Sequence, residues 1–342
     1  MILFLPAALS LFFSLLFICI PDSAKEIRKA GIFSGLIIFG TALLSCGRGV
    51  TLDPVMETFF GWDSFSKLAV ILIGFFVMLI SVYSAGFLKE KVNRFFSLFF
   101  LTAFSAFGIV LSRHWILFTI FWGISGITLY LMMQLEEDAK DAAKKTLVLL
   151  GGTDTMLLLA VAVIFNLTGS FAIAESPFHP LAFFFLLSAS FAKAGNMPFH
   201  TWIPSCAEKA PLPVTAYLPA SLDKVLGIYL LMRVFQIFTV PDWARVIVMG
   251  LGALTIISAV FMALSQHNGR KLLAYHAVSQ VGYMVLGIGT GTVLGMAAGV
   301  FHMVNHAIYK SALFLGMGSV EKLRGTDRLE KLGGLARVLP YT

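Results

Sequence analysis

The chain has 342 residues, of which 58% are hydrophobic and 13% charged, with a formal net charge of +7. Soluble domains have about 25% charged residues, so too few polar side chains remain here to cover a water-facing surface. The mean hydropathy of +0.88 and the 33 phenylalanines agree. The composition therefore excludes an ordinary soluble domain and predicts an integral membrane protein.

Eleven apolar stretches are long enough to form transmembrane helices, because a helix needs about 20 residues to cross roughly 30 Å of hydrocarbon. The alternating strands of membrane barrels are absent, so we predict an all-α polytopic membrane protein with about eleven helices. The first stretch lacks the basic residues that open a cleaved signal, and we expect it to be retained. The stretches lie near residues 2–20, 31–47, 65–87, 95–112, 115–134, 146–168, 180–194, 214–238, 243–265, 272–289 and 293–319.

The basic residues between these stretches are concentrated in alternate loops. This alternation supports the helix count, because a wrong count would not produce it. One side has only Arg48, Lys67, Arg113, Arg233 and Arg245. The other side has Lys25, Arg28, Lys29, Lys89, Lys91, Arg94, Lys140, Lys144, Lys145, Lys209, Arg270, Lys271, Lys322, Arg324, Arg328, Lys331 and Arg337. The positive-inside rule predicts an N-terminus outside the cell and a cytoplasmic C-terminal segment. Short clusters of this kind indicate membrane topology and not nucleic-acid binding.

Three lysines fall inside apolar stretches: Lys193, Lys224 and Lys310. A lysine in a membrane helix costs several kcal/mol, and it exchanges protons more readily because desolvation disfavours its charged form. The three lysines therefore predict a proton relay. The alternative is a set of structural lysines that pair with carbonyl groups or extend to lipid headgroups.

Two histidines precede Lys310 in the last stretch. His302, His306 and Lys310 follow one another at four-residue intervals, which places them on one helical face. Because histidine changes charge near physiological pH, this stack predicts a proton path. The alternative is a group of satisfied polar side chains that hold helices together, a role that Asn305 and Ser311 could share.

Two acids within the apolar stretches are candidate counter-ions. Asp223 is next to Lys224, but neighbours on a helix point about 100° apart, so the two need not pair. Asp154 is either a buried counter-ion or, if its helix begins after Gly152, a polar N-terminal cap.

The seventh stretch is predicted to be broken just after Lys193. Gly195, Pro198 and Pro204 follow this lysine, and proline removes a backbone donor and clashes with the preceding turn. Broken membrane helices are tolerated where they line a cavity or are buried in protein, and they often mark ion sites.

No motif indicates a cofactor or metal. The three cysteines, Cys19, Cys46 and Cys206, are widely spaced and predict apolar fillers, not an iron–sulfur site. Neither a phosphate-binding loop nor a dinucleotide fingerprint occurs. We expect no cofactor and no metal in this chain, so any redox chemistry belongs to partner chains.

Several segments in chain order resemble a known family, the antiporter-like membrane subunits of respiratory complex I, of Mrp cation/proton antiporters and of group 4 membrane-bound hydrogenases. The segments are FAKAGNMPFHTWIPSCAEKAPLPVTAYLPASLDKVLGIYLLMR, KLLAYHAVSQVGYMVLGIG, FHMVNHAIYKSALFLGMGSV and, more weakly, WDSFSKLAVILIGFFVMLISVYSAGFL. The resemblance covers nearly the whole chain.

The resemblance implies two inverted five-helix repeats, each with a half-channel, a broken helix and a key lysine. It divides the chain into N-terminal helices over 1–94, a first repeat over 95–240 and a partial second repeat over 241–342. The family's lysines of helices 7 and 8 fall at Lys193 and Lys224, and its basic residue of helix 11 falls at Lys310. Its two histidines fall at His302 and His306. Their protonation is expected to be coupled to redox events in neighbouring subunits.

The sequence departs from the family pattern in two places. The family usually has a glutamate in a Phe-Trp-Glu run that pairs with the helix-7 lysine, whereas the run here is Phe121-Trp122-Gly123. We hypothesise that Asp154 substitutes; a reporter of Lys193 protonation that ignores Asp154→Asn would refute this. Family members also usually continue through about three more helices. We therefore expect an incomplete second repeat, either in a fragment or in a chain completed by a separate subunit.

The resemblance favours a proton-translocating, antiporter-like subunit of a redox-driven membrane complex, similar to NADH:quinone oxidoreductase or membrane-bound hydrogenase, in a plasma membrane. The expected partners are membrane and peripheral subunits, the lipid bilayer, and H⁺ with Na⁺ as the alternative cargo. Two other functions stay open. One is a Na⁺/H⁺ antiporter subunit of the Mrp type, and the other is a structural or coupling subunit that does not pump.

Overall fold

The computed structural model describes residues 2–22, 26–47 and 52–340. The predicted loop charges Lys25 and Arg48 and the last two residues lie outside the described residues. Within the described part the chain forms helices and no β-strand, with three isolated bridges at Phe60↔Ser112, His114↔Ala172 and Asn268↔Arg328. The all-α prediction is therefore confirmed.

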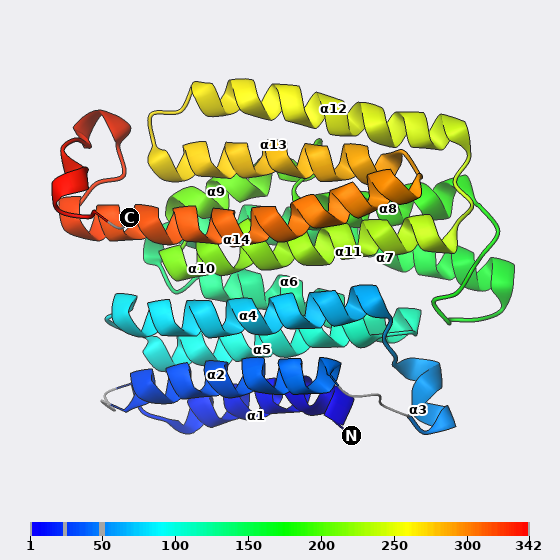
Figure 1. Cartoon of the computed structure of the whole chain (residues 1–342), viewed down its shortest axis with the longest axis horizontal. Coiled ribbons are helices and arrows are strands. Elements are labelled where there is room, and N and C mark those ends of the chain that lie inside the picture. The colour runs from blue at the N-terminus through cyan, green and yellow to red at the C-terminus, as the bar shows by residue number, and fades with distance from the viewer. Residues whose placement is uncertain (1, 23–25, 48–51, 341–342) are drawn as a thin grey trace. The chain divides into compact units, whose positions relative to one another are not determined.

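Helices cover each of the eleven apolar stretches. Seven of the described helices, namely α2, α4, α5, α6, α7, α12 and α13, are long and apolar enough to cross a membrane, and α1 is a shorter apolar helix. The helices are α1 Leu5–Cys19, α2 Ile27–Cys46, α4 Ser64–Phe87, α5 Val92–Leu111, α6 Trp115–Met133, α7 Lys140–Thr168, α8 Pro180–Ala194, α10 Leu212–Tyr217, α11 Asp223–Ile237, α12 Asp242–Leu264, α13 Gly269–Gly289 and α14 Val293–Arg324 (Figure 1).

Polar residues outside the apolar stretches fix where several helices begin. Asp63 accepts a hydrogen bond from the Ser66 amide (2.8 Å) at the start of α4. Asn268 accepts one from the Lys271 amide (2.9 Å) at the start of α13. These side chains satisfy amide groups that have no partner inside the helix. The same chemistry creates a short helix that the hydropathy pattern does not predict, α3 Pro54–Phe59, which Asp53 caps.

The chain divides into two compact units. The first comprises Met1–Leu135, Leu150–Ala189 and Gln236–Phe238. In it, α1 packs against α2 and α5, α2 against α4, and α5 against α4 and α6. Phenylalanine dominates this core: the ring of Phe96 lies 5.2 Å from that of Phe17. A Cβ on Gly31 would lie 2.3 Å from Phe96, so only glycine allows this approach.

The second unit comprises Glu136–Leu149, Ser190–Phe235 and Thr239–Thr342. Here α13 packs against α12, α14 and α9 Trp202–Lys209, and α14 packs against α10 (Figure 1). The α12–α13 contact is close because a Cβ on Gly282 would lie 2.6 Å from the Gly252 carbonyl oxygen. The predicted repeat boundaries near residues 94 and 240 stay a prediction.

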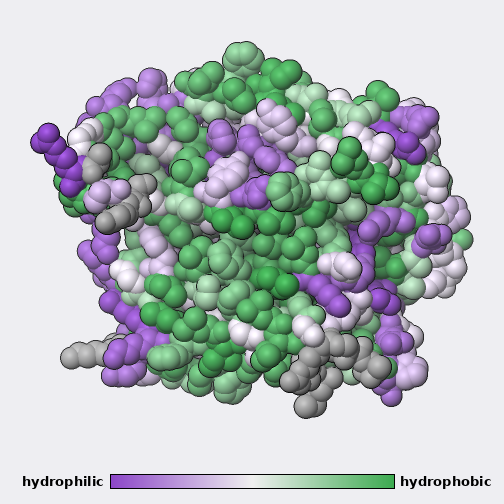
Figure 2. All heavy atoms as spheres, in the orientation of Figure 1, coloured by the Kyte–Doolittle hydropathy of each residue, from purple (hydrophilic) through white to green (hydrophobic). Residues whose placement is uncertain are grey.

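The outer face of α12 is apolar. Leu254, Ile257, Phe261 and Leu264 are all more than half exposed on this one helix, and Figure 2 shows hydrophobic atoms over it. A water-facing helix would present polar residues there. This surface therefore fits contact with lipid, in agreement with a multi-pass membrane protein.

Candidate functional site

The predicted break after Lys193 is present. α8 ends at Ala194, and Gly195 follows with φ +84°, a left-handed conformation that favours glycine. A helix that ends inside protein leaves carbonyl groups without partners. Here the Trp202 indole N–H donates to the Ala192 carbonyl (2.8 Å), and Lys224 Nζ donates to the Ala194 carbonyl (2.9 Å).

A second interruption lies between α10 and α11. Residues Leu218–Leu222 form a π-helical turn, a local distortion that is frequent at functional sites. Pro219 within it lacks an amide donor. Two hydroxyl groups satisfy a neighbouring carbonyl: Ser221 Oγ and Ser311 Oγ both donate to the Ala216 oxygen, over 3.0 and 3.1 Å. The turn leaves Asp223 and Lys224 at the start of α11.

A glycine on α11 brings the two interruptions together. A Cβ on Gly227 would lie 2.4 Å from the Ala194 backbone nitrogen. The Ser190 hydroxyl also donates to the Gly227 carbonyl over 2.8 Å. The first turns of α11 therefore lie directly against the end of α8.

This approach pairs two of the predicted site residues. Lys193 Nζ lies 3.4 Å from Asp223 Oδ1, and the two side chains are 2% and 0% exposed. Lys224 points instead to the end of α8, where the helix dipole is negative. Asp223 thus pairs with the lysine 30 positions earlier, and the adjacent Lys224 has a different polar partner.

The three predicted residues of α14 lie on one face, as their spacing requires. His306 and Lys310 are fully buried, and the His302 and His306 rings are 6.4 Å apart. Among the described residues, neither ring nitrogen of His306 has a hydrogen-bond partner. His306 lies between His302 and Lys310 on the buried face of α14.

Two residues of α13 complete this cluster, and sequence reasoning missed both. His276 Nδ1 lies 2.8 Å from Lys310 Nζ. Gln280 Oε1 lies 3.0 Å from His302 Nε2 and accepts a hydrogen bond from the Tyr309 hydroxyl over 3.2 Å. Both residues fall inside the apolar stretch 272–289. A histidine or glutamine inside an apolar stretch is costly to bury for the same reason as a lysine, so the sequence carried a signal for both.

Asp154 belongs to the first unit. α7 begins at Lys140, so Asp154 lies in the middle of a helix, and the capping interpretation is wrong. Its Oδ1 accepts a hydrogen bond from the Trp122 indole N–H over 2.8 Å. At Gly123, where the family usually has glutamate, a Cβ would meet no described atom within 4 Å. The substitution of Asp154 for that glutamate stays a hypothesis.

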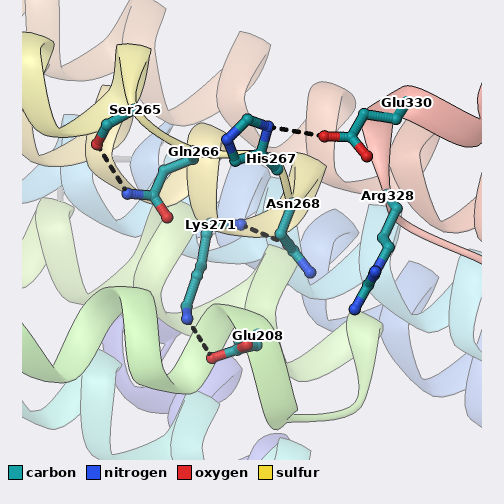
Figure 3. Close-up of a pocket in the computed structure, with 8 residues that line it drawn as sticks. All are labelled: Glu208, Ser265, Gln266, His267, Asn268, Lys271, Arg328 and Glu330. Carbon is teal, nitrogen blue, oxygen red and sulfur yellow. Dashed lines mark hydrogen bonds and ion pairs between the residues drawn. The ribbon is translucent and has the colours of Figure 1, made fainter.

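A separate polar pocket of about 420 Å³ lies at the N-terminal end of α13 (Figure 3). Two pairs of side chains lie in it: Lys271 Nζ is 2.8 Å from Glu208 Oε2, and His267 Nδ1 is 3.0 Å from Glu330 Oε1. The lining contains no predicted relay residue. It consists of Glu208, Ser265, Gln266, His267, Asn268, Lys271, Arg328 and Glu330.

These features define a multi-pass helical membrane protein with broken helices and buried titratable side chains in its second unit. Residues 112–342 match the family described as NADH:quinone oxidoreductase/Mrp antiporter, transmembrane region. The chain belongs to this family, which confirms the resemblance. In residues 2–22, 26–47 and 52–340, no group of three or more His, Cys, Asp or Glu side chains is arranged to hold a metal ion.

The similar curated proteins come from antiporters and from quinone oxidoreductases. The chain is 30% identical, over 82% of its length, to the A/B component of a probable K⁺/H⁺ antiporter of Rhizobium meliloti. It is 30% identical over 77% to the A1 component of a Na⁺/H⁺ antiporter of Staphylococcus epidermidis, and 28% identical over 94% to NAD(P)H-quinone oxidoreductase subunit 5, chloroplastic, of Marchantia polymorpha. These matches span 29%, 36% and 53% of the relatives' own lengths.

Three solved structures share the fold. A chain of the archaeal membrane-bound sulfane sulfur reductase matches with TM-score 0.83 and 23% identity, over 97% of this chain and 73% of that one. A chain of respiratory complex I from Thermus thermophilus matches with TM-score 0.81 and 25% identity, over 99% of this chain and 75% of that one. A chain of the Mrp complex from a Dietzia species matches with TM-score 0.87 and 24% identity, over 99% of this chain and 40% of that one.

Proposed function

We propose that this chain is a proton-translocating, antiporter-like subunit of a redox-driven membrane complex. The observation that carries the proposal is the buried series in the second unit: Lys193 with Asp223, then Lys224, His306 and Lys310. Ionisable groups at membrane depth are costly and mark ion pathways and proton relays. The relay role of these residues, with His302 beside them, is part of the proposal.

The position of His306 supports a relay over a purely structural cluster. His306 is fully buried, its ring lies 6.4 Å from that of His302, and Lys310 follows one turn later on the same face of α14. Because histidine changes charge near physiological pH, it suits a group that accepts and releases a proton in turn.

A Na⁺/H⁺ or K⁺/H⁺ antiporter subunit is the second candidate, because the relatives from Rhizobium meliloti and Staphylococcus epidermidis carry antiporter names. Both candidates require partner subunits in the membrane. A tag on this chain, followed by purification in mild detergent, tests them together. Co-purified chains with flavin or iron–sulfur centres support the redox-driven complex, whereas only small membrane subunits support the antiporter.

The proposed orientation places the N-terminus outside and the C-terminal segment in the cytoplasm. A membrane-impermeant maleimide tests it in a chain whose three native cysteines are replaced by alanine. In intact cells the maleimide should label Asp242→Cys, which is on the side of Arg245, and should not label Lys144→Cys. In inverted vesicles it should label Lys144→Cys. The opposite pattern would show that the orientation is reversed.

A further inference from the structure

The only described polar contact of Lys310 Nζ that joins it to another helix is the one with His276. The two nitrogens are 2.8 Å apart, between α14 and α13. A lysine ammonium can only donate, so Nδ1 is the acceptor when Lys310 is charged. When Lys310 is neutral, its amine can accept from an imidazolium. The contact therefore suits proton transfer in either direction without a rearrangement of the helices.

The two partners differ in exposure. Lys310 is fully buried, whereas His276 is half-buried. Gln280 is also half-buried, and so are His302 and Tyr309, which both hydrogen-bond to its Oε1; Asn305 is exposed. Figure 2 shows a hydrophilic patch over α13 and α14, surrounded by hydrophobic atoms. Because Lys310 is fully buried and His276 is half-buried, His276 is the more exposed partner of the pair.

The charged side chain that contacts His276 comes from α14. Within the described residues, this side chain is Lys310, whose Nζ lies 2.8 Å from Nδ1 of His276. No ion pair among the described residues joins a carboxylate to His276. A proton that reaches His276 is therefore not held there by a counter-ion.

We propose that His276 is a further proton-transfer residue of this chain and exchanges its proton directly with Lys310. The proton leaves Nζ of the Lys310 ammonium and binds Nδ1 of the neutral His276, which leaves a neutral amine and an imidazolium; no electron moves. The inference rests on the proposed function and extends it by one residue, at the end of the series nearest the surface.

Two substitutions in the assembled complex separate proton transfer from hydrogen bonding. His276→Gln keeps an oxygen that can accept from Lys310 but cannot carry a proton. It should lower cation transport by about 100-fold or more, since a positioned proton-transfer group typically contributes about 10²–10⁴-fold. His276→Glu restores a group that titrates and should recover several-fold of that loss. The matched control His267→Gln changes an exposed histidine beside the same helix and should leave transport unchanged.

Each outcome is decisive when transport is expressed per assembled complex. Native-level transport in His276→Gln overturns the inference, and so does His276→Glu transport as low as that of His276→Gln. Should the variants not assemble, carbethoxylation of the native complex replaces them: modification of His276, located by peptide mass spectrometry, should stop transport, and modification without loss overturns the inference. Lys310→Ala separates the two proposals, because native transport in that variant contradicts the proposed function itself.

Discussion

Replacement of Lys224 by methionine should remove transport and leave the protein folded. Lys224 is fully buried, and its Nζ donates to the carbonyl at the end of α8 over 2.9 Å. A structural lysine would have this same contact, so the structure by itself is compatible with both roles. The free energy of unfolding distinguishes them.

The expected magnitude follows from opposing contributions. Loss of a hydrogen bond from a charged donor costs about 1.5–3 kcal/mol, and loss of a cation at a helix C-terminus costs up to about 2 kcal/mol. Removal of a buried charge returns its desolvation penalty of several kcal/mol, and apolar residues of similar volume often replace buried ions without loss. We therefore expect the free energy of unfolding of Lys224→Met to stay within about 2 kcal/mol of the native value.

The assay compares thermal unfolding in detergent with cation transport in vesicles for Lys224→Met. The control is Lys209→Met, because Lys209 is exposed at the end of α9. The relay role predicts near-native unfolding, near-native assembly and no transport. A loss of more than about 4 kcal/mol together with failed assembly would instead assign Lys224 a structural role.

Three further predictions test the rest of the site. Asp223→Asn should destabilise the protein by about 3–5 kcal/mol, because it removes one member of a buried ion pair. The double variant Lys193→Met with Asp223→Leu should recover stability but not transport, as measured by thermal unfolding and vesicle transport. Native transport in Lys193→Ala would favour the non-pumping subunit. His306→Phe should unfold at the same temperature as the native protein, since it loses no described hydrogen bond, yet it should not support cation transport. Gly227→Val should fail to assemble, as measured by size-exclusion chromatography, because its Cβ would lie 2.4 Å from the Ala194 nitrogen.

Hydropathy and loop charge were sufficient to predict the helices. A membrane crossing requires about 20 apolar residues, and lipid leaves few alternatives to a helix as the spanning structure. The break after Lys193 was predictable for a similar local reason, since Gly195 weakens a helix and Pro198 lacks the amide donor that a helix needs. The start of α7 was not predictable from hydropathy. Its first turns, from Lys140, are charged and lie outside the apolar stretch, which is why Asp154 was open to interpretation as a cap.

The partners within the site were not predictable from one sequence, because they depend on tertiary contacts. Asp223 is adjacent to Lys224 in the sequence but pairs with Lys193. Gly227 makes this pairing possible, because it has no Cβ and so allows α8 to approach α11 closely. Likewise, no local pattern joins His276 to Lys310, which is 34 positions later. The sequence signals which residues are costly to bury, whereas packing decides which of them meet.

The most direct test measures redox-driven ΔpH and Na⁺ uptake in inverted membrane vesicles, with native complex compared with Lys224→Ala and Lys310→Ala. A buried relay predicts that cation movement is lost in both variants while the complex stays assembled, and the ion that moves in the native vesicles identifies the cargo. Unchanged cation movement in both variants would contradict the relay and would assign the pumping to neighbouring subunits.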